Sequence, residues 1–410
     1  IKQFPTRSDF KNLTNNLMDL DEFAKNCIPA QERINLDNKI KFFKTHNAYW
    51  QNYEKNYFFT DANNTLGVIY IVRDPRNVIT SIMDYFNKNN WEAKDLIVNS
   101  FFLQKAWGEN NHIKISELRS KIPHKFFKFP IIGKKLVNIN RLLDIAKEQI
   151  KTFKPDILYC QDLSFFPEEI LLKIKKENNI RLIVGQIACP LPPKSFLKPY
   201  DLILTSFPHF VNRLRNDGKN CDYFKIGFDQ RILSKIIQND RDIDFSFMGG
   251  ISKHHSYASK NIEYLIKNAK LQVYGYGAKN LPYNSKIRKN HKGERWGSDM
   301  YNILSRTKIS FNRHINVSEN NANNMRLYEA TGMGSLLLTD KKDNLKKLFE
   351  EDREIVTYKS KEEALHKYNY LIHNPAELAN IAKAGQLRTL KEHTYENRIK
   401  ELIQILNKYL

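Results

Sequence analysis

The stretch Ile309–Asp340, ISFNRHINVSENNANNMRLYEATGMGSLLLTD, decides the fold predicted for this chain. Residues 309–311 are typical of the end of a buried strand, residues 323–331 of a helix, and residues 335–339 of the next buried strand. A strand, a loop, a helix and a strand in this order predict a parallel, doubly wound sheet of the α/β class. Ligands of such sheets lie outside the carboxyl ends of the strands, so we expect a site in this loop.

The expected site carries cations and amide groups, namely Arg313, His314, Asn324 and Arg326. Backbone N–H groups at a helix start and the helix dipole favour negative charge, so the start of the predicted helix suits a phosphate group. The combination predicts an anionic ligand such as a diphosphate.

A carboxylate and two glycines follow within the same predicted helix and turn. Glu329 lies about one turn further in, where a carboxylate can accept both hydroxyls of a ribose. Gly332 and Gly334 lack a Cβ and so allow a ligand to approach the backbone closely. The alternative is a capped helix between two core strands, and the local pattern alone favours neither interpretation.

From about Lys88 to Leu410 the chain resembles the CgeB-like, spore-maturation-type glycosyltransferases of the GT-B class, which transfer a sugar from a nucleotide donor. Four places carry the resemblance: WEAKDLIVNSFFLQKAW at 91–107, DILYCQD at 156–162, segments GQIACPLP, SFPHFVNRLRNDG and KIGFD within 185–229, and 324–340 with EHTYENR at 392–398. It implies donor-binding roles for Asn324, Arg326, Glu329, Gly332 and Gly334. Asn321 departs from the wider family-4-like motif, which has a second Glu eight positions before the one matching Glu329.

The resemblance implies two Rossmann-like domains that face a cleft. We expect an incomplete sulfotransferase-like segment at 1–86, an acceptor domain at 87–240, a nucleotide-sugar domain at 241–387, and a final helix at 388–410 that returns to the acceptor domain. The apolar patterns predict strands at 95–99, 156–160, 181–186, 201–205, 223–226, 245–248 and 271–274, and helices at 142–152, 168–178, 361–373, 375–390 and 395–410. Residues 114–137 have no clear period and are expected to be a loop or insertion that contacts the acceptor or a membrane.

The expected reaction is glycosyl transfer, with cations that stabilise the departing diphosphate. Lys253 follows the Gly249-Gly250 turn, where the resemblance implies a phosphate contact, and the Gly275/Gly277 pair is only part of a dinucleotide fingerprint. Asp162 and His209 follow predicted strands and are the candidate bases. We expect metal-independent turnover without a cofactor. Retention or inversion at the sugar stays open.

The first 86 residues show a different pattern. The apolar run LGVIYIV at 66–72 leads into Arg73 and, eight positions later, Ser81. A buried strand followed by a basic residue and a helix start is a phosphate-binding layout. The segment resembles the middle of a sulfotransferase, which implies a leaving-phosphate contact for Lys44, a base role for His46, and a 3′-phosphate contact for Arg73 and Ser81.

The phosphosulfate loop of that family would lie before Ile1, so we expect no sulfate transfer by these 410 residues. Phosphoadenosine phosphosulfate is a co-substrate only if that upstream part exists. The alternatives are a remnant sheet packed against the transferase and a fragment of a bifunctional protein.

The composition limits the partners. Lys and Arg number 66 against 45 Asp and Glu, a net charge of +21, so the surface attracts anions. Lys is spread throughout the chain, which favours solvated faces over a nucleic-acid surface. We expect a nucleotide sugar and a glycan, lipid-linked or protein acceptor, and the non-enzymatic alternative is a basic protein that binds glycan or nucleic acid. Four separated cysteines and the lack of a ~20-residue apolar run fit a cytoplasmic protein, with peripheral contact at the inner membrane face as an option.

Overall fold

The computed structural model describes residues 51–52, 57–58, 85–94, 96, 98, 101–111, 139–236, 240–251 and 256–410. Contacts divide the chain into two units, Ile1–Asn77 and Val78–Leu410. In the first unit, β1 (Gln51–Asn52) pairs antiparallel with β2 (Tyr57–Phe58). The predictions for Lys44, His46, Arg73, Ser81, Lys253 and residues 114–137 lie outside the described residues.

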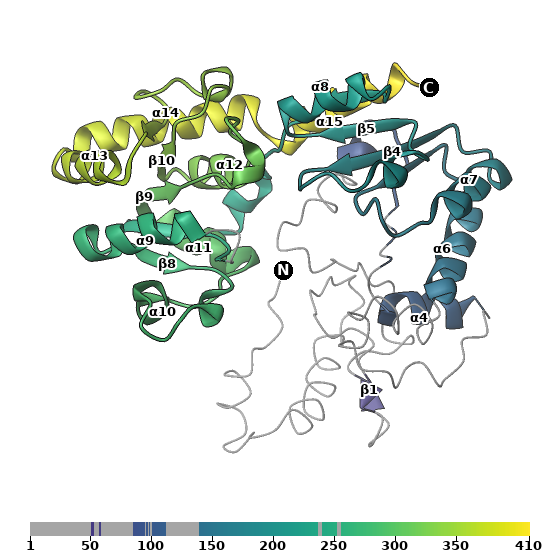
Figure 1. The fold of residues 1–410 in the computed structure, drawn as a ribbon, viewed down its shortest axis with the longest axis horizontal. Coiled ribbons are helices and arrows are strands. Elements are labelled where there is room, and N and C mark those ends of the chain that lie inside the picture. Colours follow the sequence, from purple (N-terminus) through teal and green to yellow (C-terminus); the bar gives the residue numbers. More distant parts are fainter. Residues whose placement is uncertain are drawn as a thin grey trace, which may run out of the picture. The chain divides into compact units, whose positions relative to one another are not determined.

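The second unit contains a four-stranded parallel sheet with the order β3-β4-β5-β6 (Figure 1). Its strands are short and largely apolar, as expected of strands covered on both faces: β3 (Ile157–Cys160), β4 (Leu182–Ile187), β5 (Leu202–Thr205) and β6 (Cys221–Tyr223). The helices of this part of the chain are α4 (Phe101–Asn110), α6 (Ile139–Phe153), α7 (Glu168–Glu177) and α8 (Pro208–Asn216).

A five-stranded parallel sheet follows, with the order β11-β10-β9-β7-β8. Its strands are β7 (Ile243–Met248), β8 (Gln272–Tyr274), β9 (Thr307–Asn312), β10 (Leu336–Asp340) and β11 (Val356–Tyr358). Its helices are α9 (Ser256–Ala269), α10 (Lys286–Asn290), α11 (Gly297–Arg306), α12 (Arg326–Gly332), α13 (Lys361–His373) and α14 (Pro375–Glu392). Because β8 and β9 lie on opposite sides of β7, the strand order reverses there, which is where doubly wound sheets bind ligands.

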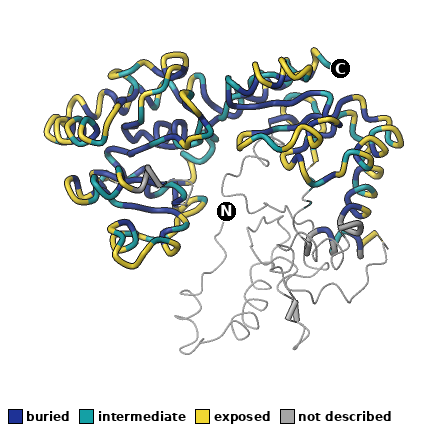
Figure 2. Tube along the Cα trace, viewed as in Figure 1, coloured by how far each residue is buried: buried dark blue, intermediate teal, exposed yellow. Residues whose placement is uncertain are grey.

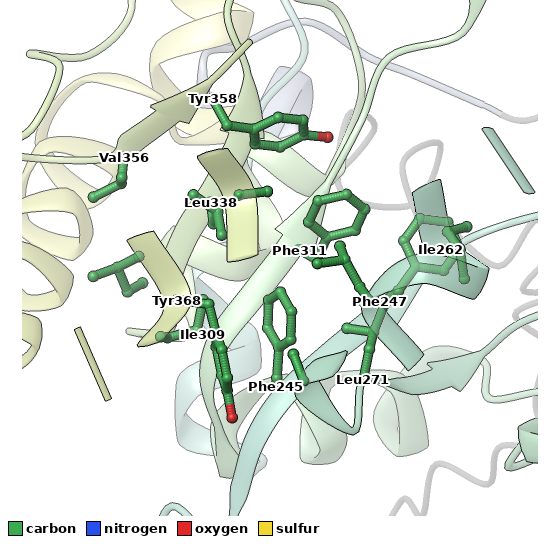
Figure 3. Close-up of a cluster of buried hydrophobic side chains, with 14 of the residues drawn as sticks. Phe245, Phe247, Ile262, Leu271, Ile309, Phe311, Leu338, Val356, Tyr358 and Tyr368 are labelled. Carbon is green, nitrogen blue, oxygen red and sulfur yellow. The ribbon is translucent and has the colours of Figure 1, made fainter. Parts of the chain in front are cut away.

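Apolar side chains fill both faces of the second sheet. On one face, aromatic rings from the strands and from α13 pack together, with Phe245 stacked on Tyr368 and Phe311 on Tyr358 (Figure 3). On the other face, Leu337 packs in a cluster with residues of α11 and α12. Figure 2 shows the buried residues concentrated along the strands. This burial fixes the strand ends, and therefore the loops that follow them.

The last helix, α15 (Tyr395–Asn407), packs against the first sheet (Figure 1). Ile399 and Leu402 are fully buried in one cluster with strand residues of β4 and β5. Buried Arg398 donates hydrogen bonds to the carbonyl groups of Ile226 and Glu392. The chain therefore returns from the second sheet to the first.

The α/β fold with parallel sheets is confirmed, but two predicted strands need correction. In the range 95–99, Leu96 is not in a strand and Val98 lies in a turn. The strand predicted at 223–226 lies earlier, at Cys221–Tyr223, because only these residues pair with β5. The predicted helix at 323–331 begins at Arg326, after a turn at Met325.

Candidate functional site

The carboxyl ends of β7, β9 and β10 bring together most of the residues predicted from the second sheet. β7 ends at Met248 and pairs with β9, which ends at Asn312, while β10 lies on the other side of β9. Arg313 and His314 continue from β9, and α12 begins at Arg326. The predicted site therefore coincides with the reversal of strand order.

Arg326 and Glu329 form a largely buried ion pair on α12. Arg326 Nη1 lies 3.0 Å from Glu329 Oε2, with 13% and 4% of the two side chains exposed. The Nε atom of Arg326 donates to the carbonyl of Met248 at 3.2 Å, which joins α12 to the end of β7. Arg326 Nη1 makes no hydrogen bond of good geometry among the described residues, so the contact with Glu329 is electrostatic rather than a directed hydrogen bond.

A tyrosine from α11 completes the surroundings of the carboxylate. The hydroxyl of Tyr301 donates to Glu329 Oε1 at 3.5 Å. Burial, followed by the nearby charge of Glu329, raises the pKa of Tyr301 well above its ordinary value. Tyr301 therefore stays neutral and acts as a donor, and Glu329 keeps acceptor capacity for ligand hydroxyls.

Asn324 holds the loop between β9 and α12. Its Nδ2 donates to Asn312 Oδ1 at 3.0 Å and to the carbonyl of Arg313 at 3.3 Å. Its Oδ1 accepts from the N–H of Leu327 at 3.2 Å, which caps the helix start. Both amide ends thus have protein partners that give Asn324 a positioning role, and its predicted ligand contact stays a prediction.

The phosphate site predicted at the start of α12 stays a prediction. The helix has only seven residues, and three of its first N–H groups are bonded within the protein, Leu327 to Asn324 and Tyr328 and Glu329 to the carbonyl of Met325. We therefore expect side chains to contribute most to holding an anion at this edge.

Arg313 is the side chain best placed for that task. It is partly buried, and its guanidinium has no hydrogen bond or ion pair with any other described residue. Burial lowers the pKa of Arg313, and the neighbouring Tyr358 and Asp340 offset this effect only in part. A desolvated cation without a bonded counterion is an electrostatic site for an anionic ligand.

His314 and Asp340 form a buried pair beside Arg313. His314 Nδ1 lies 2.7 Å from Asp340 Oδ1, and the N–H of His314 donates to the same oxygen at 2.9 Å. Burial acts to raise the pKa of Asp340, but the hydrogen bond and charge of His314, with Lys342 nearby, hold it below its ordinary value. Nε2 of His314 is buried and has no hydrogen-bond partner in the described part of the chain.

The sequence prediction missed the roles of Asp340, Tyr301 and Tyr358. Asp340 is the last residue of β10, next to the end of β9, so the rule about strand ends could have identified it. Tyr301 lies on a helix that was not predicted, and Tyr358, on β11, donates to the carbonyl of Asn312 at 2.9 Å. Those two contacts depend on tertiary packing.

The glycines predicted to approach a ligand pack against protein. A Cβ on Gly332 would lie 2.7 Å from the ring of Phe228, and one on Gly334, which has φ +73°, would lie 2.8 Å from Arg241. Close packing thus accounts for the missing Cβ atoms of Gly332 and Gly334, and their predicted ligand role stays a prediction.

The glycines after β7 and β8 also pack closely against protein atoms. Gly275 has φ +123°, and a Cβ there would collide with the carbonyl oxygen of Gly249. Gly277 meets the backbone of Ile251 in the same way, and the N–H of Ile251 donates to the carbonyl of Tyr276 at 2.9 Å. Two loops that run this close need glycine whether or not a ligand binds.

The two candidate bases, Asp162 and His209, follow strands of the first sheet, and both contact other protein residues. Asp162 is exposed, and its Oδ1 accepts from the N–H and the hydroxyl of Ser164 at 2.9 and 2.6 Å. Nδ1 of His209 lies 3.0 Å from Asn321 Nδ2, and its Nε2, which is buried, lies 3.9 Å from Glu319. Burial is the main cause that lowers the pKa of His209. The contacts of His209 indicate that it joins α8 to the loop before α12.

Metal sites and membrane-spanning helices were searched for among the described residues only. Within them, no group of three or more His, Cys, Asp or Glu side chains is arranged to hold a metal ion. Their helices are also too short or too polar to cross a membrane. Metal-independent turnover stays a prediction.

Comparisons with known proteins agree with this architecture. A family model described as glycosyl transferase-like matches residues 257–404. No curated protein gives a significant match.

Among solved structures, Anabaena HepE in complex with UDP-glucose has 12% identity and a TM-score of 0.55, covering 82% of this chain and 97% of that one. A glycosyltransferase from Rickettsia africae has 13% identity and a TM-score of 0.56, with coverages of 81% and 94%. Sucrose-phosphate synthase from Thermosynechococcus elongatus has 9% identity and a TM-score of 0.50, with coverages of 70% and 80%. Residues 257–404 thus match a glycosyltransferase-like family model, and the chain has the GT-B fold.

Proposed function

We propose that this chain transfers a glycosyl group from a nucleotide-sugar donor to an acceptor hydroxyl, and that the end of the second sheet binds the donor. One observation carries the proposal. Arg313, a cation without a bonded counterion among the described residues, lies at the reversal of strand order with the buried Arg326–Glu329 pair. Cations suit a diphosphate, and a carboxylate suits the paired hydroxyls of a ribose.

In the proposed reaction, the bond between the anomeric carbon and the diphosphate oxygen breaks as the acceptor oxygen bonds to that carbon. Negative charge grows on the departing diphosphate, so Arg313 and Arg326 stabilise the transition state more than the bound donor. The acceptor proton leaves to a base or to solvent. His209 is not assigned that role, because its Nδ1 contacts Asn321 and its Nε2 is buried.

The choice of donor rests on the family domain and on the neighbouring structures. HepE is described in complexes with UDP-glucose and with UDP and glucose, so UDP and UDP-glucose are the first probes. The CgeB-like subtype, suggested by the segments around 91–107 and 392–398, is part of the proposal. The acceptor class is a hydroxyl on a glycan, lipid carrier or protein.

The test is a thermal-shift screen against nucleoside diphosphates, nucleotide sugars and phosphoadenosine phosphosulfate, because a ligand of the native state raises its stability. Calorimetry with UDP then compares wild type, Arg313→Met and the control Arg353→Met, which changes an exposed arginine on the same domain. We expect roughly tenfold weaker UDP binding in Arg313→Met only, since a charged hydrogen bond contributes about 1.5–3 kcal/mol.

Two outcomes would contradict the proposal. One is UDP affinity in Arg313→Met equal to that of the control. The other is binding of polyanions without preference among nucleobases and with a steep loss in salt, which indicates a general anion-binding protein.

A further inference from the structure

The connection between β8 and α11 exposes aromatic rings. Tyr276, Tyr283 and Trp296 are 49%, 83% and 42% exposed, and only two other exposed aromatic residues, Phe196 and Tyr370, occur in the described part of the chain. Because these three rings are exposed, packing in a buried core does not account for aromatic residues at these positions. A concentration of exposed aromatic residues on one short segment marks an interaction surface.

The same segment, residues 276–296, is strongly basic. It holds six Lys and Arg against one carboxylate, Glu294, whereas the whole chain has 66 against 45. None of the six forms an ion pair with another described residue, and five of them are exposed: Lys279, Lys286, Lys289, Lys292 and Arg295. Their charge is therefore available to an anionic partner.

The segment is held in place by the domain beneath it. Ile287 of α10 is fully buried, and Glu263 of α9 accepts from the hydroxyl of Ser285 at 2.8 Å. The N–H of Lys292 donates to the carbonyl of Val273 at 2.8 Å, which ties the segment to β8, the edge strand of its sheet. Figure 1 shows α10 beside β8, and Figure 2 shows exposed residues around it. A preformed surface loses little conformational entropy on binding.

The geometry of the rings narrows the kind of partner. Tyr276 and Trp296 are stacked on each other with an interplanar angle of 15°, and the guanidinium of Arg288 lies 3.8 Å from the ring centre of Tyr283. One face of each ring is therefore already covered by a neighbouring side chain of the same segment. Amphipathic rings beside lysines and arginines suit the headgroup region of an anionic bilayer.

We propose that residues 276–296 form a surface that binds anionic phospholipid bilayers without crossing them. The cations are attracted to the lipid phosphates and headgroup charges, and the rings of Tyr283 and Trp296 enter the interface. This surface belongs to the nucleotide-sugar half of the fold. The proposal does not depend on the proposed transferase activity.

The test is co-sedimentation of the full chain with vesicles of phosphatidylcholine alone or with 30% phosphatidylglycerol. Binding is expected only to the anionic vesicles, and it is expected to weaken with salt. The variant Lys286→Glu/Lys289→Glu/Lys292→Glu should bind at least 100-fold more weakly, since each cation near such a surface contributes about fivefold. Its control carries the same charge change at exposed lysines elsewhere: Lys346→Glu/Lys347→Glu/Lys383→Glu.

A second pair of variants tests the rings. Tyr283→Ser/Trp296→Ser should bind anionic vesicles at least fivefold more weakly than Tyr370→Ser, which alters a ring that is 50% exposed on α13. Thermal unfolding establishes that each variant is folded. The proposal is overturned if wild type does not bind anionic vesicles, if the two lysine triples weaken binding equally, or if the ring variant binds as its control does. If the variants of this surface bound UDP more weakly but bound vesicles as wild type does, that result would also overturn the proposal and would assign the surface to the donor site.

Discussion

Replacing Glu329 with Gln will lower both the stability of the fold and the affinity for a nucleoside diphosphate. In the wild type, the carboxylate lies 3.0 Å from Arg326 Nη1, and both side chains are largely buried. Glu329→Gln keeps the volume but leaves the charge of Arg326 without its partner. Removal of one member of a buried pair costs about 3–5 kcal/mol.

We expect the lower end of that range, about 3 kcal/mol, because Arg326 retains its hydrogen bond to the carbonyl of Met248. For a domain of this size, that corresponds to a decrease in Tm of about 6–12 °C. The affinity for UDP should fall roughly ten- to a hundredfold, the effect of losing one charged hydrogen-bond acceptor.

A second variant separates these two effects. Glu329→Gln/Arg326→Met removes both charges, and a flexible thioether at 326 can pack near Met300, which already contacts Arg326. Scanning calorimetry should show most of the lost stability restored in the double variant, whereas titration with UDP should show no recovery. Unchanged UDP affinity in the folded single variant, or full recovery in the double variant, would refute the donor-site assignment and leave the pair as a core ion pair.

Three further predictions concern stability. Gly275→Ala should lower it by about 3 kcal/mol, measured by urea unfolding, because the Cβ would meet the carbonyl of Gly249 at a φ of +123°. Burial lowers the pKa of His393 to about 4. Because unfolded His binds protons below its ordinary pKa of about 6.5, stability should fall by about 2 kcal/mol between pH 7.5 and 5, and His393→Gln should flatten this fall in urea melts at several pH values. Leu402→Ala, at a fully buried position of α15, should cost about 2–4 kcal/mol in the same urea assay, and a cost below 1 kcal/mol would contradict the packing of α15 on the first sheet.

The sequence predicted the regular elements best where one pattern was long and uninterrupted. The helix predicted at 361–373 has the bounds of α13, since Ser360 caps its start and Leu371 and Tyr368 give it a buried face. Short strands were harder to bound. Val356–Tyr358 was not predicted, because three residues are too few to show a period and β11 is defined by its pairing with β10.

For the candidate site too, the sequence indicated groupings of residues that are near in sequence but not contacts between distant segments. Arg313, Arg326 and Glu329 could be grouped because all three follow the end of one strand, β9, within one short stretch of chain. The contact between His209 and Asn321 joins residues 112 positions apart, and nothing in either local sequence indicates it. The role of the glycines could not be settled from the sequence for a related reason. Whether a missing Cβ leaves room for a ligand or for Phe228 depends on a segment that lies far away in sequence.

The motif EHTYENR at 392–398 shows how a stretch that carries a family resemblance can be structural. Its Arg398 is fully buried and donates to the carbonyl groups of Ile226 and Glu392 and to Nδ1 of His393. That bond makes Nδ1 of His393 the acceptor, so Nε2 carries the proton and donates to the carbonyl of Leu348 at 2.8 Å.

The N–H of Phe228 donates to the carbonyl of His393 at 2.8 Å, which holds together the two places where the chain passes between the sheets. A buried arginine whose donors are used by backbone carbonyls and neighbouring side chains has little capacity left for substrate. The motif therefore stabilises the crossing between the sheets, and the proposed donor site lies at the edge where Arg313 has no bonded partner among the described residues.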